Sequence, residues 1–171
     1  MVYISTFVIV FWFFVSYAHM DERLVWDLME RLRVLFEIAS EYEFVEWNDR
    51  QIVVGNDWDV EIKEAMEAVD FGLLMVSPGF LGRPYILEQE LTHFLDQGED
   101  GVKILKPVVP VGLKKVLLDG SVDSKGLGNL QIFRNGDGRW FSELRGNNRD
   151  LFVDALFQAI LVKLRRMGSE E

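Results

Sequence analysis

The chain has 171 residues, 49% of them hydrophobic, which is enough for one domain with a substantial core. Its 18 basic and 28 acidic residues give a net charge of −10, which argues against a nucleic-acid-binding protein, because that affinity depends on clustered Lys and Arg. The absence of cysteine excludes disulfides and thiolate metal sites, so we expect a reducing, cytoplasmic compartment.

Residues 1–20 contain no Asp, Glu, Lys or Arg. A membrane-spanning helix needs roughly 20 apolar residues, and this stretch is interrupted by Ser5, Thr6 and Ser16 and lacks the basic flank of a signal peptide. We therefore expect residues 1–11 to form an apolar lead-in to the domain and not a membrane anchor. An anchor and a start-site extension are the alternatives.

Strands and helices alternate from the N-terminus. Residues 8–17 are β-branched and aromatic without alternation, which is typical of a strand buried on both faces. Residues 21–40 place apolar side chains at helical spacing, with Asp21 and Glu22 in the first turn, where the helix dipole favours acidic residues. The next expected elements are a strand at 43–47, a loop at 48–57 and a helix at 58–69.

A third buried strand is predicted at residues 71–76, where Ser77-Pro78-Gly79 ends it. A helix should follow over residues 84–97, with Pro84 in its first turn. The remaining expected elements are an irregular strand at 104–113, a long connection at 119–149 with a short strand near 130–133, and a closing helix at 150–167. This alternation predicts an open parallel sheet with helices on both faces.

Three segments lie where a predicted strand gives way to a helix, at residues 16–23, 46–58 and 77–91. These junctions meet at the carboxyl ends of parallel strands, where α/β proteins bind ligands. The chain has no GxxxxGK[ST], GxGxxG or GxSxG motif, which argues against an ATPase, a dinucleotide dehydrogenase and a serine hydrolase. His19 and His93 are too few and too far apart for a metal site.

The third junction contains two candidate carboxylates, Glu88 and Glu90. At about 100° per residue, Glu90 falls inside the apolar arc of the predicted helix and Glu88 falls outside it. An ionised carboxylate on a half-buried face needs either a structural partner, such as Arg83, or a functional task. The arc is formed by Ile86, Leu87, Leu91, Phe94 and Leu95.

The second junction combines aromatic side chains with carboxylates. Trp47, Asp49 and Trp58 have the chemistry to stack on a nucleotide and hydrogen-bond to it. Trp58 is more simply explained as a core anchor of the following helix, whereas Trp47 fits both interpretations. Asp21 in the first junction is either a helix cap or a binding residue.

Taken in order, these segments resemble the TIR (Toll/interleukin-1 receptor) domain in its bacterial form. FVSYAHMDE at residues 14–22 is similar to the first box of the family, and EWNDRQIVVGNDW at 46–58 is similar to the loop after the second strand. The similarity continues through residues 69–78 and 85–91. It implies a TIR domain at residues 12–167, a frayed tail at 168–171, and a flavodoxin-like open parallel sheet of about five strands.

Many members of this family cleave the nicotinamide glycosidic bond of NAD+ with a glutamate on the helix after the third strand. The matching residue here is Glu90. The resemblance further implies that Tyr17, Asp21, Trp47 and Asp49 line the substrate pocket. The family spacing is W-x-x-x-E, whereas Tyr85 and Glu90 are one residue further apart, which keeps Glu88 as a second candidate.

The expected function is therefore that of a TIR-domain NAD+ hydrolase in immune or stress signalling such as antiphage defence. NAD+ is its substrate, and we expect no separate cofactor or metal. The expected partners are other TIR domains and an unknown sensor or effector protein. The alternatives are a non-enzymatic TIR interaction module that assembles through residues 48–57, and a related nucleoside-processing enzyme of the same fold. Linear and cyclic ADP-ribose both remain possible products.

Overall fold

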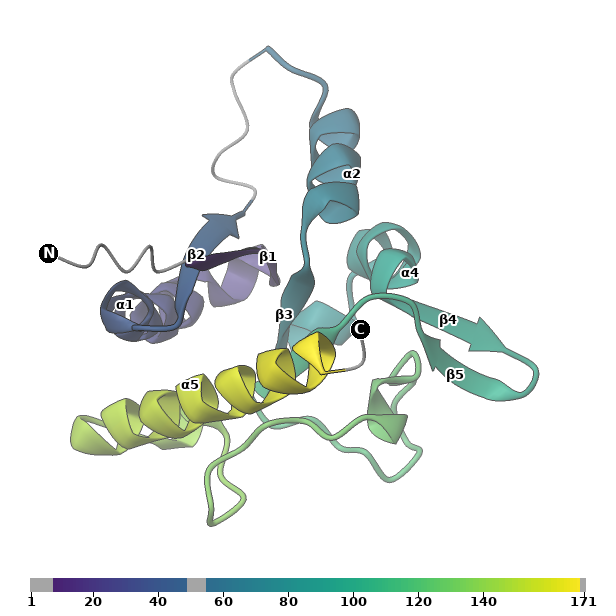
Figure 1. Ribbon diagram of the computed structural model, residues 1–171. Coiled ribbons are helices and arrows are strands. Elements are labelled where there is room, and N and C mark those ends of the chain that lie inside the picture. The colour runs from purple at the N-terminus through teal and green to yellow at the C-terminus, as the bar shows by residue number, and fades with distance from the viewer. Residues whose placement is uncertain (1–7, 49–54, 170–171) are drawn as a thin grey trace, which may run out of the picture.

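The computed structural model describes residues 8–48 and 55–169 (Figure 1). The strands are β1 (Ile9–Ser16), β2 (Tyr42–Trp47), β3 (Phe71–Val76), β4 (Leu95–Gly98), β5 (Gly101–Ile104) and β6 (Val108–Gly112). The α-helices are α1 (Glu22–Ile38), α2 (Trp58–Ala68), α3 (Pro78–Leu81), α4 (Leu91–Phe94) and α5 (Asn147–Gly168). A π-helix, η3 (Ile86–Glu90), precedes α4, and 3-10 turns occupy η1 (His19–Asp21), η4 (Leu127–Asn129) and η5 (Phe141–Glu143).

Four parallel strands form the main sheet in the order β2-β1-β3-β6. This confirms the predicted flavodoxin-like parallel architecture, although the described sheet has four strands and not about five. The short strand expected near residues 130–133 is reduced to a single bridge between Val111 and Phe133. Beyond Phe133 the chain turns at Asn135, whose side chain accepts hydrogen bonds from the backbone of Asp137 and Arg139, and pairing with β6 ends.

Each face of the sheet is covered by its own helices, because alternate strand residues point to opposite faces. Phe13 and Val15 of β1 pack with α1 and α5, whereas Phe14 packs with α2 and α4. Helix α1 contributes an apolar stripe at helical spacing, formed by Val25, Leu28, Met29, Leu32 and Phe36. In Figure 1 the helices lie on both sides of the strands, with α5 running alongside α1.

The helix predicted over residues 84–97 ends at Phe94, three residues early. The carbonyl of Phe94 accepts a hydrogen bond from the backbone N–H of Leu105 at 2.9 Å, so the chain leaves the helix there. Residues 95–104 instead form an antiparallel hairpin of β4 and β5, in which Leu95 pairs with Ile104. Figure 1 shows this hairpin projecting away from the rest of the molecule.

The strand predicted over residues 104–113 is interrupted as well. Ile104 ends the hairpin strand β5, and the sheet strand β6 begins only at Val108. Pro107 separates them, since it has no N–H to donate to a neighbouring strand. Its carbonyl still accepts a hydrogen bond from Gly72 at 3.0 Å, which aligns β6 with β3.

The first strand of the sheet begins within the apolar N-terminal stretch, because β1 starts at Ile9. Residues 9–11, which were expected to belong to the lead-in, pair in register with Tyr42, Glu43 and Phe44 of β2. Within residues 8–48 and 55–169, no helix has both the length and the apolar character needed to cross a bilayer.

Candidate functional site

Two buried serine–carboxylate pairs lie at the carboxyl ends of the adjacent strands β1 and β3. Ser16, the last residue of β1, donates its hydroxyl hydrogen to Oε2 of Glu90. Ser77, directly after β3, donates to Oδ2 of Asp21 at 2.5 Å. All four side chains are at most 7% exposed. A buried carboxylate is costly without partners, so these serines stabilise both acidic groups in their positions.

Glu90 is the last residue of the π-helix η3. The backbone N–H of Leu91 donates to the carbonyl of Ile86, five residues earlier, where a regular α-helix would use a partner four residues earlier. The wider turn absorbs one extra residue between Tyr85 and Glu90. Glu90 therefore faces the interior at 7% exposure, whereas Glu88 is exposed to solvent.

An aromatic pair lies within electrostatic range of this carboxylate. The ring centroids of Trp58 and Tyr85 are 4.6 Å apart, with the ring planes inclined by 35°. Burial, a hydrogen bond to Asp59 and the negative charges of Asp59 and Glu90 raise the pKa of the Tyr85 hydroxyl. The expectation that Trp58 is a core anchor is wrong, because its side chain is 41% exposed and packs on Tyr85 at the surface.

Asp21 is the N-cap residue of α1, but its side chain makes no capping hydrogen bond. The helix-cap interpretation is therefore wrong for its carboxylate. Oδ1 lies 2.5 Å from Nζ of Lys114, and Oδ2 accepts the Ser77 hydrogen bond. Ser77 also accepts a hydrogen bond from the backbone N–H of Phe80 at 2.9 Å, so it caps α3 and positions Asp21 at the same time.

The other residues expected in the pocket lie in different surroundings. The ring of Tyr17 is buried against Trp26 in the core between the sheet, α1 and α5. Trp47 stacks on Phe14 at the opposite face, with centroids 5.0 Å apart and planes inclined by 15°. Asp49 lies outside the described residues.

The structure thus brings Glu90 together with Ser16 and Tyr85, whereas Asp21 belongs to a different group with Ser77 and Lys114. A cavity lined by Asp21 does not include Glu90, Tyr17 or Trp47. The sequence interpretation missed both serine contacts. The position of each serine at the end of a buried strand, beside a neighbouring strand end, is the signal that predicts such a role.

Within residues 8–48 and 55–169, no group of three or more His, Cys, Asp or Glu side chains is arranged to hold a metal ion.

Comparison with known proteins identifies the fold family. A sequence model described as "TIR domain" matches residues 13–144, which is more than half of the chain. The chain is 29% identical over 96 residues to the uncharacterized protein y4lF of Sinorhizobium fredii, covering 56% of this chain and 29% of that protein. It is 30% identical over 128 residues to a scytalone dehydratase-like protein of Claviceps purpurea, covering 62% of this chain and 76% of that protein.

Neither name describes an enzyme that cleaves NAD+. The chain spans only 29% of the length of the rhizobial protein. The family match begins in β1 and extends across all four strands of the parallel sheet. The chain therefore belongs to the TIR domain family, a family of signalling domains.

Proposed function

We propose that this TIR domain hydrolyses NAD+ at the nicotinamide glycosidic bond, with Glu90 as the catalytic carboxylate, in immune or stress signal transduction. The proposal rests above all on one observation: Glu90 is 7% exposed and its carboxylate is held by the hydroxyl of Ser16. A carboxylate kept in a fixed position inside an apolar environment is suited to stabilising positive charge.

The reaction needs only one carboxylate. The bond between C1′ of the ribose and the nicotinamide nitrogen breaks, and its electron pair leaves with nicotinamide, which departs as a neutral molecule. Since the leaving group needs no proton, the second carboxylate of an ordinary glycosidase is not required. Glu90 stabilises the oxocarbenium-like ribose that remains. Water then adds its oxygen to C1′ and releases a proton, giving ADP-ribose.

The aromatic pair beside Glu90 supports binding of the positively charged nicotinamide ring. Trp58 presents 41% of its surface to solvent, close to Tyr85. A ligand cation over an exposed aromatic face gains about 0.5 to 1 kcal/mol, and more when water is excluded. Tyr85 is protonated and neutral at physiological pH, because the ordinary pKa of tyrosine is 10.0 and its surroundings raise it further, so it adds no charge of its own. Tyr17, Asp21, Trp47 and Asp49 remain the proposed pocket residues on the basis of the family resemblance.

The test is release of nicotinamide from NAD+ by the purified chain at several protein concentrations. Glu90→Gln keeps the size of the side chain and removes its charge. Glu88→Gln makes the same change two positions away at an exposed site. We expect release by the native chain and by Glu88→Gln and at least a hundredfold loss in Glu90→Gln. Equal activity in native protein and Glu90→Gln would overturn the site assignment.

The alternative is a non-enzymatic module that assembles with other TIR domains. It predicts that the native chain releases no nicotinamide at any concentration, including concentrations at which it self-associates. Light scattering on the same samples shows whether the chain is assembled. Assembly without nicotinamide release would favour the interaction module.

A further inference from the structure

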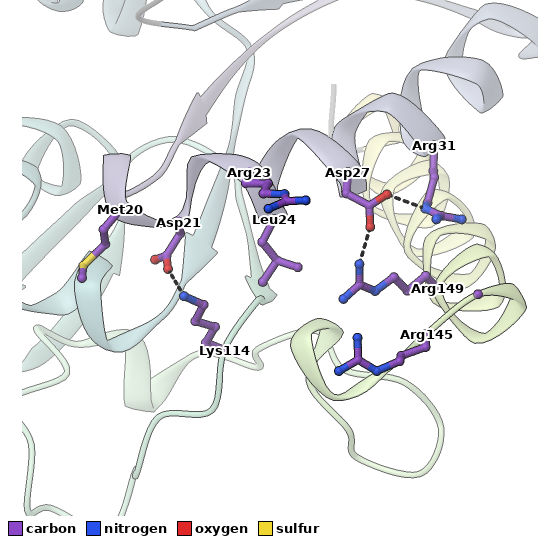
Figure 2. A pocket seen from close by; sticks show the side chains of 10 residues that line it. Met20, Asp21, Arg23, Leu24, Asp27, Arg31, Lys114, Arg145 and Arg149 are labelled. Carbon is purple, nitrogen blue, oxygen red and sulfur yellow. Dashed lines mark hydrogen bonds and ion pairs between the residues drawn. The ribbon is translucent and has the colours of Figure 1, made fainter.

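A cavity of about 770 Å³ opens where the start of α1, the segment after β6 and the start of α5 meet (Figure 2). Pockets that bind small molecules typically measure about 300 to 1,000 Å³. Asp21, one of the proposed pocket residues, lines the cavity, whereas Glu90, Ser16 and Tyr85 do not, so the proposed catalytic carboxylate lies outside it. The bond cleavage proposed above gives no role to the arginine and lysine side chains of this cavity.

The lining of this cavity is cationic in an acidic protein. Five cationic side chains, those of Arg23, Arg31, Lys114, Arg145 and Arg149, surround it together with only two carboxylates. The whole chain has a net charge of −10. A concave surface lined by one sign of charge concentrates its field and attracts ions of the opposite sign. The cavity is therefore suited to an anion.

Three of these cations have carboxylate partners. Lys114 pairs with Asp21 at 2.5 Å. Arg31 and Arg149 both contact Asp27, at 3.2 and 2.6 Å, and hold it between α1 and α5. These pairs are visible in Figure 2. Arg31 also pairs with Asp150, so three carboxylates balance these three cations. The remaining positive charge of the cavity lies on two other residues.

Arg23 and Arg145 carry that remaining charge. Both side chains are exposed, and neither forms an ion pair or a side-chain hydrogen bond with any residue of the described ranges 8–48 and 55–169. Figure 2 shows Arg145, two residues before α5, and Arg149 of α5 extending into the space below α1, the helix that carries Arg23. The structure thus gathers two uncompensated guanidinium groups from distant parts of the chain around one cavity.

We propose that this cavity binds the phosphate or pyrophosphate group of a small molecule, with Arg23 and Arg145 as its principal ligands. The planar guanidinium group donates two parallel hydrogen bonds to phosphate oxygens, which is why arginine is preferred over lysine in such sites. Met20 and Leu24 supply apolar contacts for the rest of the ligand. A nucleic acid fits less well, because the net charge of −10 repels a long phosphate backbone.

The test is calorimetric titration of the full chain in a phosphate-free buffer with pyrophosphate, adenosine 5′-monophosphate and adenosine. We expect the two phosphate compounds to bind and adenosine to show no binding. Arg23→Gln and Arg145→Gln should each weaken binding by about tenfold or more. Arg139→Gln is the matched control, because it removes one exposed positive charge outside the cavity and should leave the affinity unchanged.

Binding that persists in Glu90→Gln would separate this cavity from the proposed catalytic site, and we expect that result. The proposal would be overturned if neither phosphate compound binds, or if adenosine binds as tightly as its monophosphate. It would also be overturned if Arg139→Gln weakens binding as much as Arg145→Gln, since the effect would then be one of net charge alone. Both tested arginines are exposed and unpaired, so their replacement is not expected to disturb folding.

Discussion

Ser16 and Glu90 lie 74 residues apart in the sequence, yet the hydroxyl of Ser16 donates directly to the carboxylate of Glu90 in the interior. This contact connects the end of the central strand β1 to the π-helix η3. It ties the orientation of the proposed catalytic group to the buried end of β1. The first prediction tests this connection.

Replacing Ser16 with alanine removes a donor to a buried carboxylate. The free energy of unfolding should fall by about 1 to 3 kcal/mol, because Glu90 then lacks a hydrogen bond where water cannot replace it. Nicotinamide release should also decrease if Glu90 is catalytic. Urea unfolding and the NAD+ assay measure the two effects. Ser40→Ala, at an exposed position, is the control and should change neither. Full stability in Ser16→Ala would contradict the importance of this contact.

Deleting Glu88 should convert the π turn into a regular α turn. Glu88 is exposed and lies between Tyr85 and Glu90, so its removal shortens their separation to the family spacing. We expect Glu90 to remain beside Ser16 and stability to be unchanged or higher, since π turns are rare and absorb inserted residues. Crystallography and urea unfolding measure these outcomes.

Deleting Thr92, in the regular turn α4, is the matched comparison for this experiment. It rotates the buried Phe94 out of register and should destabilise the protein. If the Glu88 deletion is as damaging as the Thr92 deletion, the wide turn itself is required and not merely tolerated.

The substitution Gly72→Ala is expected to destabilise the core, because it adds a methyl group there. A Cβ atom built there would lie 2.8 Å from Cε1 of the Phe94 ring, which is fully buried. Overpacking of this kind costs about 1 to 3 kcal/mol. Gly136→Ala is the control, because a Cβ there meets no atom within 4 Å. The two unfolding midpoints should separate clearly, and equal midpoints would show that the Phe94 ring moves aside at little cost.

His93 should make the free energy of unfolding depend on pH in the weakly acidic range. Partial burial, together with the charges of Lys63 and Lys106, lowers the pKa of His93 below its ordinary value of 6.5, against the opposing charge of Glu67. The imidazole of His93 therefore takes up a proton more readily in the unfolded chain than in the folded chain. As a result, the contribution of His93 to stability is lost as pH falls through and below 6.5.

The measurement is urea unfolding of the native chain and His93→Gln at about pH 7.5 and about pH 5.5. The native chain should lose more stability than the variant between the two conditions. Identical losses would mean that His93 does not contribute to the pH dependence.

The sequence alone predicted the features that depend on local periodicity and chain order. The unbroken apolar runs of β1 and β3 indicated strands buried on both faces, and their alternation with helices indicated a parallel sheet. The angular position of Glu90 on a regular helix predicted an inward-facing carboxylate, and Glu90 is buried, although the segment is a π-helix with a wider turn. Residues 130–133 show the limit of this approach. Their apolar side chains predicted a short strand, whereas in the structure only Phe133 forms a bridge, to Val111.

Contacts between distant residues were decided by the tertiary structure. Glu90 accepts a hydrogen bond from Ser16, the carbonyl of Phe94 accepts one from Leu105, and Asp21 pairs with Lys114, 93 positions later in the sequence. None of these pairings follows from propensity or periodicity, because each depends on which strand ends and helix ends the fold brings together. The sequence by itself determined the sheet and the inward carboxylate, whereas folding supplied their partners, since a buried polar group takes whichever donor the packed chain places beside it.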